Sequence, residues 1–234
     1  MVTTKRRVGP NTASDSLNLG CGLKAPENWL NVDGSLQVVF ARRPRLKRIL
    51  VEIGLYPKSQ AEIPWPANVM RLDLRKPLPF PNDRFIAVYS SHTIEHLYYD
   101  EAAALTSECH RVLKSGGVFR VVVPDLAAIV RRYLLRSSQP DSKDTAAERF
   151  MDELLLHPRV AEHGLIGLYH RLCGFHQHKW MYDAPGLGKL LREVGFVEVS
   201  NPLCLQGMLP ACQEVEDPER ILDGAGIVVE GVKA

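Results

Sequence analysis

Several features that mark particular classes of protein are scarce in this sequence. Its 234 residues include only 5 cysteines, none in a C-x-x-C pair, which argues against a disulfide framework and a structural zinc site. The 29 Lys and Arg residues nearly balance the 27 Asp and Glu residues, so no strong overall field calls for nucleic acid or an anionic membrane as partner. No apolar run approaches the roughly 18 residues of a membrane span, and no apolar segment follows the basic start. These absences predict a cytoplasmic protein with reduced thiols.

The remaining composition is that of an ordinary globular domain. Hydrophobic residues make up 45% of the chain and charged residues 24%. A chain of this length suits one α/β domain with insertions better than two full domains. We expect a disordered basic tail over residues 1–14, a single domain over 15–234, and helical insertions at about 35–66 and 137–182.

Short apolar segments alternate along the chain with segments of helical period. Near-continuous apolar strands separated by helices are typical of a mainly parallel sheet that is covered on both faces. We therefore predict a doubly wound, mostly parallel sheet with helices on both faces and a ligand crevice beyond the carboxyl ends of its strands. The expected strands are 16–19, 29–33, 68–74, 85–90, 118–123, 196–199 and 226–232. The expected helices are about 35–56 with a break at Pro44, 93–113 with a glycine C-cap at 116–117, 126–135, 146–156, 164–172 and 185–194.

Glycine and aspartate residues follow three successive strands. The turn Gly20-Cys21-Gly22 ends the first strand, Asp33 ends the second, and Asp73 ends the third. A glycine turn lets a ligand approach the backbone closely, and carboxylates accept hydrogen bonds from ribose hydroxyls and from an adenine amino group. Each acid alone is more often a cap or turn residue. Together they favour an adenosine-bearing ligand that has no pyrophosphate.

Two other function classes stay open at this level. Residues 20–25 satisfy the loose dinucleotide pattern G-x-G-x-x-A, which is the basis for a nicotinamide-dependent oxidoreductase, but Pro26 follows at once and leaves little room for a pyrophosphate-binding helix. Basic residues gather over 42–48, which is the basis for a non-catalytic binding protein with a basic patch. A solvated helix face explains that patch more simply, and nucleic acid is an unlikely partner.

The motifs taken together resemble a known family. They are residues 17–22 (LNLGCG), Asp33, Asp73 with Leu74, residues 91–97 (SHTIEHL) and residues 111–117 (RVLKSGG). In these features the sequence resembles the class I S-adenosylmethionine-dependent methyltransferases. Residues 179–183 (KWMYD) and 190–196 (LLREVGF) also look like the end of a small branch associated with saccharide biosynthesis.

The resemblance implies a fold, a cofactor and a set of contacts. The fold is a seven-stranded, Rossmann-like methyltransferase fold, and the cofactor is S-adenosylmethionine. Asp33 would bind the ribose. The other implied cofactor contacts are Gly20, Cys21 and Gly22 at the methionine part, Asp73 and Leu74 at the adenine, and Ser90 and Ser91 at the methionine end.

His92 is the main candidate for catalysis. It follows the fourth strand, where the donor methyl group should point, and a histidine can deprotonate a hydroxyl acceptor. That His92 only caps or packs the following helix is an equally good interpretation. Glu95 and His96 are further catalytic candidates. With His92 they offer a divalent ion only three ligands, so we assign no metal from the sequence.

The acceptor is expected to contact the second insertion. Histidines and aromatic residues gather there and could present hydrogen-bond donors and ring faces to a polar small molecule such as a sugar, although packing explains each residue singly. We expect O-methylation of a small hydroxylated acceptor, and no pattern indicates an oligomeric state. The residues of this expected lid are His163, His170, His176, His178, Trp180 and Tyr182.

Overall fold

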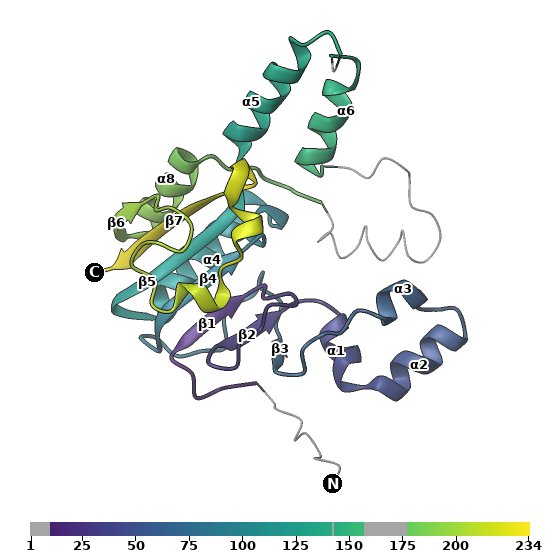
Figure 1. Cartoon of the computed structure of the whole chain (residues 1–234). Coiled ribbons are helices and arrows are strands. Elements are labelled where there is room, and N and C mark those ends of the chain that lie inside the picture. Colours follow the sequence, from purple (N-terminus) through teal and green to yellow (C-terminus); the bar gives the residue numbers. More distant parts are fainter. Residues whose placement is uncertain (1–9, 142, 157–176) are drawn as a thin grey trace.

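The computed structural model describes residues 10–141, 143–156 and 177–234, and its centre is one seven-stranded sheet (Figure 1). The strand order is β3-β2-β1-β4-β5-β7-β6. The pairs among β1 to β5 are parallel, whereas β7 runs antiparallel to both β5 and β6. The sheet is therefore mixed, with a parallel part and one antiparallel hairpin. The strands are β1 (Ser16–Leu19), β2 (Leu30–Asp33), β3 (Val69–Arg71), β4 (Phe85–Ser91), β5 (Leu113–Pro124), β6 (Phe196–Ser200) and β7 (Gly226–Lys233).

Most of the helices lie where the periodicity predicts them. Pro44 is the first residue of α2, so the expected proline break separates two short helices. The α-helices are α1 (Gln37–Arg42), α2 (Pro44–Glu52), α3 (Lys58–Ala61), α4 (Tyr99–Val112), α5 (Leu126–Ser137), α6 (Lys143–Leu154), α8 (Ala184–Val194) and α9 (Cys212–Val215); the 3₁₀ turns are η1 (Ile94–His96), η2 (Pro218–Arg220) and η3 (Leu222–Gly224). The helix expected at 164–172 lies outside the described residues.

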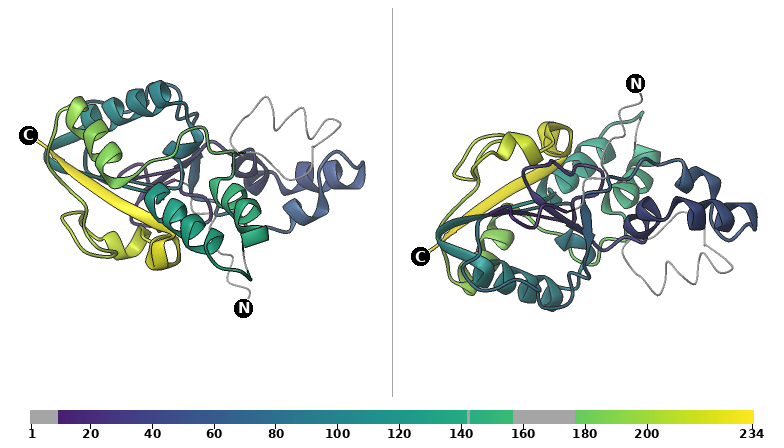
Figure 2. Two further views of the ribbon diagram at one scale, coloured as in Figure 1. Left: turned by 90° about the horizontal axis from the view of Figure 1, so that it is seen from above. Right: turned by 90° about the horizontal axis from the view of Figure 1, so that it is seen from below.

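Alternate residues of the central strands face two separate apolar layers. Val88 and Phe119 face the layer that α4 and α8 cover, while Ala87 and Val118 face the other side. The two faces are seen in Figure 2, where α4 and α8 lie on one side of the sheet and the yellow-green segment 201–225, just before β7, lies on the other. This period of two is the side-chain alternation of a strand buried on both faces.

The second face differs from the prediction of helices on both sides. It is covered mainly by the irregular segment 201–225, which contributes only the four-residue α9 and two 3₁₀ turns to the described structure. A buried charged group fixes this segment to the sheet. Arg120 on β5 forms ion pairs with Glu216 at 2.7 Å and Glu230 at 3.0 Å, and it donates to the backbone carbonyl of Gln206. Side-chain pairing thus holds in place a segment that has little regular hydrogen bonding of its own.

The helix predicted at 93–113 is divided and ends earlier. A 3₁₀ turn, Ile94–His96, is separated from α4 by extended residues at 97 and 98, and the Glu101 carboxylate accepts a 3.0 Å hydrogen bond from the backbone N–H of Tyr98. That contact favours a new helix start at Tyr99. Gly116 does not form the expected C-cap. It lies within β5 at a positive φ of 77°, where the register with β4 shifts.

Order also begins earlier than the sequence predicts. Residues 1–9 of the expected tail lie outside the described residues, but Ser14 is buried and its hydroxyl donates a 2.6 Å hydrogen bond to the carbonyl of Asn28. Arg84 donates to the carbonyls of Thr12 and Ser14. In the described part of the chain, no helix is long and apolar enough to cross a membrane.

Two groups of helices project from the sheet (Figure 1). Helices α1 to α3 form one group between β2 and β3. Helices α5 and α6 form the other, in which the rings of Tyr133 and Phe150 lie 4.9 Å apart and Glu153 pairs with Arg132 and Arg136. Both groups follow strand ends on the carboxyl side, so they flank the edge of the sheet where a ligand crevice is expected.

Candidate functional site

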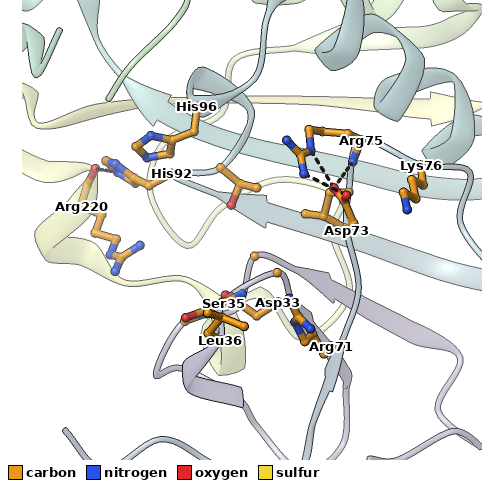
Figure 3. Close-up of a pocket in the computed structure, with 15 residues that line it drawn as sticks. Asp33, Ser35, Leu36, Arg71, Asp73, Arg75, Lys76, His92, His96 and Arg220 are labelled. Carbon is orange, nitrogen blue, oxygen red and sulfur yellow. Dashed lines mark hydrogen bonds and ion pairs between the residues drawn. The ribbon is translucent and has the colours of Figure 1, made fainter. Parts of the chain in front are cut away.

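A cavity of about 670 Å³ opens at the carboxyl ends of the parallel strands (Figure 3). The strand order reverses between β1 and β4, and ligands of open α/β sheets bind at such a point. The volume falls within the usual range for small-molecule sites, roughly 300 to 1,000 Å³. The lining residues are Gly20, Gly22, Asp33, Gly34, Ser35, Leu36, Arg71, Asp73, Leu74, Arg75, Lys76, His92, Thr93, His96 and Arg220.

The glycine turn after β1 meets the segment after β4. Gly20 has a φ of +62°, and a Cβ atom at this position would lie 2.0 Å from the Thr93 hydroxyl oxygen. No side chain fits there without displacing Thr93. Gly22 also has a positive φ, but a Cβ added there would meet nothing within 4 Å among the described residues. Gly20 is therefore required by packing and Gly22 by backbone conformation.

Asp33 is bound to the glycine turn. One carboxylate oxygen accepts a 2.9 Å hydrogen bond from the N–H of Gly22, and the other accepts a 2.8 Å bond from the N–H of Ser35. Burial raises the pKa of Asp33, and these two N–H groups offset that rise in part. Each carboxylate oxygen can accept a second hydrogen bond. The side chain lines the cavity and is therefore equipped to accept the hydroxyls of a ribose.

Asp73 lies across the cavity from Asp33 and has a different environment (Figure 3). Both of its oxygens accept hydrogen bonds from the Arg75 guanidinium, at 2.8 and 2.9 Å. These bonds are the main reason that the pKa of Asp73 is lowered. The two side chains thus form one ion pair, and the neighbouring Leu74 is buried and lines the cavity. Sequence analysis predicted Asp73 and Leu74 at this rim but not the cation bound to the acid.

His92 adopts a backbone conformation that is uncommon for its residue type, with a φ of +48°. Its Nε2 lies 3.3 Å from the carbonyl oxygen of Arg220, and its Nδ1 lies 3.5 Å from a carboxylate oxygen of Glu95. Burial lowers the pKa of His92 to about 4, so the ring is neutral at pH 7. A positive φ at a cavity wall, held by long-range contacts, is the kind of strain that gathers at functional sites.

Glu95 lies behind this wall and is fully buried. Neither of its carboxylate oxygens has a partner at hydrogen-bonding geometry among the described residues. Burial raises the pKa of Glu95 to about 8. Its neighbour His96 reaches the cavity, and the His96 ring lies 5.0 Å from that of His178.

The structure brings most of the predicted site residues together. Cys21, Ser90, Ser91 and Glu95 belong to the described residues but do not line the cavity. Cys21 packs instead against Val38 and Val69, and burial raises the pKa of its thiol. The side chain of Ser90 is also buried away from the cavity. Of the expected lid, His163, His170 and His176 lie outside the described residues, while Tyr182 is buried and Trp180 is half exposed.

Several lining residues were not predicted from the sequence. Ser35 and Leu36 follow Asp33 and belong to the first expected insertion, so proximity to the acid was the one available signal. Arg220 lies 128 residues after His92 in a segment without periodicity. Nothing in the sequence points to its carbonyl as a partner of His92.

Part of the chain matches a known protein family. Residues 17–121 match the family model described as a methyltransferase domain. Over these residues the chain is similar to methyltransferase domains. The match extends from β1 to most of β5. It therefore includes β1 to β4, the strands whose carboxyl ends border the cavity. It supports a class I S-adenosylmethionine-dependent methyltransferase with S-adenosylmethionine as the cofactor.

Comparisons over the whole chain give more distant likenesses. A comparison with curated proteins gives no significant match. One similar solved structure is a possible histamine N-methyltransferase from Thermotoga maritima, with 16% identity, a TM-score of 0.45, and coverage of 94% of this chain and 82% of that one. Another is a putative methyltransferase from Haloferax volcanii in complex with the Trm112 activator, with 14% identity, a TM-score of 0.46, and coverage of 98% and 85%.

The residues that line the cavity fit this cofactor. The backbone at Gly20 and Gly22 borders the cavity without side chains, which allows a ligand to approach it closely. Asp33 retains accepting capacity on both oxygens although each is already held by an N–H group. The connection from β1 to β2, residues 20–29, is fully described and contains turns but no helix. A ligand with a pyrophosphate therefore finds no helix N-terminus there, whereas one without a pyrophosphate needs none.

Proposed function

We propose that the protein transfers a methyl group from S-adenosylmethionine to a hydroxyl group of a small acceptor. A saccharide or related metabolite is the favoured acceptor, and the cytoplasm is the expected location. The observation that supports this best is the meeting of the glycine turn, Asp33 and His92 around one cavity, since all three belong to the segment that is similar to methyltransferase domains. The saccharide class rests on the resemblance of residues 179–183 and 190–196.

The residues that line the cavity suggest one part for the methyl donor and another for the acceptor. Gly20 and Gly22 would lie along the methionine part of the cofactor, and Asp33 would accept hydrogen bonds from the ribose. Leu74 offers an apolar contact and the Asp73–Arg75 pair a polar edge for the adenine. His92, His96 and Arg220 are grouped at the opposite side of the cavity, which we assign to the acceptor (Figure 3).

His92 is the proposed base. In the transfer the methyl–sulfur bond breaks and its electron pair stays on sulfur, a methyl–oxygen bond forms, and the hydroxyl proton passes to His92. The Nε2 of His92 faces the carbonyl of Arg220 at 3.3 Å and carries the ring hydrogen in that contact, because a carbonyl oxygen only accepts. Proton uptake at Nε2 therefore requires the acceptor hydroxyl to replace this long contact and the ring hydrogen to move to Nδ1, which lies 3.5 Å from a carboxylate oxygen of Glu95. Positioning contributes much of the rate in such a transfer, and a general base adds about 10² to 10⁴-fold.

The two other function classes have weaker support. A nicotinamide-dependent oxidoreductase needs a pyrophosphate site, and residues 20–29 contain no helix to provide one. A non-catalytic protein with a basic patch needs free cations over residues 42–48. Three of the five cations there have other contacts: Arg42 donates to the carbonyl of Val69, Lys47 donates to that of Ala61, and Arg48 pairs with Glu52. Arg43 and Arg45 are exposed and leave a smaller patch.

The test is a screen for consumption of S-adenosylmethionine with sugars, phenols, amines and small acids as acceptors. We expect a hydroxyl compound to respond. His92→Ala should then lower turnover by about 10² to 10⁴-fold while cofactor binding survives. His110→Ala is the matched control, because that histidine packs against Phe196 far from the cavity. Preference for a nitrogen or carbon acceptor would contradict the proposed reaction, and an undiminished variant would contradict the role of His92.

A further inference from the structure

Three potential metal ligands lie together behind the acceptor side of the cavity. Glu95 and His96 come from the turn η1 after β4, and His178 comes from the segment before α8. One ligand atom from each of the three lies within 4.8 Å of the others. His178 is 82 positions beyond His96 in the chain, so the sequence pattern around η1 did not include it.

The orientation of both histidines is fixed by backbone carbonyl groups. The Nδ1 of His96 lies 3.1 Å from the carbonyl oxygen of Gln177, and the Nδ1 of His178 lies 2.9 Å from that of Leu154. A carbonyl oxygen only accepts, so each Nδ1 carries the hydrogen and each Nε2 carries the lone pair. Metal-binding histidines commonly donate their second ring nitrogen in this way.

Glu95 provides the carboxyl group, which would bind the ion in its deprotonated form. Its side chain has no exposed surface, and within the described residues neither oxygen has a hydrogen-bond partner. A buried carboxylate without partners is costly, and a cation bound to it removes that cost. The backbone oxygen of Glu95 accepts from the N–H groups of Lys179 at 2.7 Å and Trp180 at 3.2 Å. The segment that carries His178 is thus attached directly to Glu95, which holds the cluster together before any ion binds.

We propose that Glu95, His96 and His178 bind a divalent transition-metal ion. Two imidazoles and one carboxylate suit Zn²⁺, Co²⁺ or Fe²⁺ better than Mg²⁺ or Ca²⁺, which prefer oxygen ligands. Three protein ligands are typical of catalytic sites, which keep a coordination position for water or substrate.

The location gives this ion a role in the reaction proposed above, and that role rests on the proposed function. His96 lines the cavity on the same side as His92. A Lewis acid at this wall lowers the pKa of an acceptor hydroxyl and orients its oxygen. The ion would then bind the acceptor rather than the methyl donor.

Binding of Co²⁺ to the full chain tests the site without any assay of activity. The purified protein is treated with a chelator, dialysed and titrated with Co²⁺, whose visible absorption reports coordination by protein ligands. We expect saturation at one ion per chain. Glu95→Gln and His178→Asn should each weaken binding by at least about tenfold, and the asparagine can still donate to the carbonyl of Leu154. His110→Asn, on the far end of α4, is the control and should bind like the wild type.

Absence of saturable binding, or equal affinity in wild type, Glu95→Gln and His178→Asn, would overturn the proposal. Thermal unfolding without metal shows whether each variant folds, and Glu95→Gln keeps the shape of the side chain if His178→Asn does not fold. Calorimetry with S-adenosylmethionine distinguishes failure of the metal site from failure of the proposed function. A protein that binds the cofactor but not Co²⁺ refutes the metal site alone, and one that binds Co²⁺ but not the cofactor refutes the proposed function alone.

Discussion

The N–H group of Gly22 donates a 2.9 Å hydrogen bond to the carboxylate of Asp33, and this contact joins the turn after β1 to the end of β2. The acid is thereby fixed at the floor of the cavity with its second oxygen held by Ser35. A ligand that requires both the glycine turn and the carboxylate finds them already in position. This arrangement favours binding because little side-chain freedom is lost.

Gly20→Ala should destabilise the protein more than Gly22→Ala. Both glycines have positive φ values, so both substitutions introduce backbone strain of about 1 to 2 kcal/mol. Only at Gly20 would the new methyl group overlap Thr93, with 2.0 Å to its hydroxyl oxygen. Denaturant unfolding of both variants gives the comparison. Thr93→Gly should recover part of the loss in Gly20→Ala, and strictly additive effects of these two substitutions would contradict a direct clash.

Arg120→Met should lower the free energy of unfolding by about 3 to 5 kcal/mol. The substitution leaves Glu216 and Glu230 buried without their cation, and uncompensated buried charge is strongly destabilising. Arg48→Met is the matched control, because its ion pair with Glu52 on α2 is mostly exposed and contributes less than about 1 kcal/mol. Chemical denaturation measures both. A loss in Arg120→Met no larger than in Arg48→Met would show that segment 201–225 does not depend on this pairing.

The stability of the loop before β4 should depend on pH through Glu108. Hydrogen bonds from Arg111 are the main reason that the pKa of Glu108 is lowered, and the N–H of Leu78 adds to the effect. Because the folded-state pKa lies below the unfolded-state value, this contribution is present above the unfolded pKa and is lost as the pH falls through the folded pKa. Below about pH 5, the Tm of the wild type should fall more steeply than that of Glu108→Gln. Parallel curves for the two proteins would contradict the assignment.

Much of the parallel part of the sheet could be predicted from the sequence because its signals are local. Apolar runs ended by Gly20, Asp33 and Asp73 placed three residues at the correct strand ends. The start of α4 was predicted too early, since the apolar period continues through η1 while the Glu101 cap selects Tyr99. The period of apolar residues indicates which residues are buried, but it does not indicate where a capping residue ends one helix and starts another.

The rest of the site depends on contacts between distant segments. Arg120 within an otherwise apolar strand was a sign of a buried ion pair, but nothing local identified Glu216 or Glu230 as its partners. His178 and Arg220 likewise reach the cavity region from segments without periodicity. Their places follow from tertiary packing of the chain after β5, which a pattern of hydrophobic residues does not encode.

Calorimetry of the full chain with S-adenosylmethionine and its demethylated product tests the central claim most directly. We expect both compounds to bind the wild type and NAD not to bind. Asp33→Ala should weaken both affinities by roughly 1.5 to 3 kcal/mol, because a charge-assisted hydrogen bond to the ribose is lost. Asp15→Ala, an exposed acid just before β1, is the matched control and should bind like the wild type. Failure of both compounds to bind, or an unchanged affinity in Asp33→Ala, would contradict the assignment of this cavity to the methyl donor.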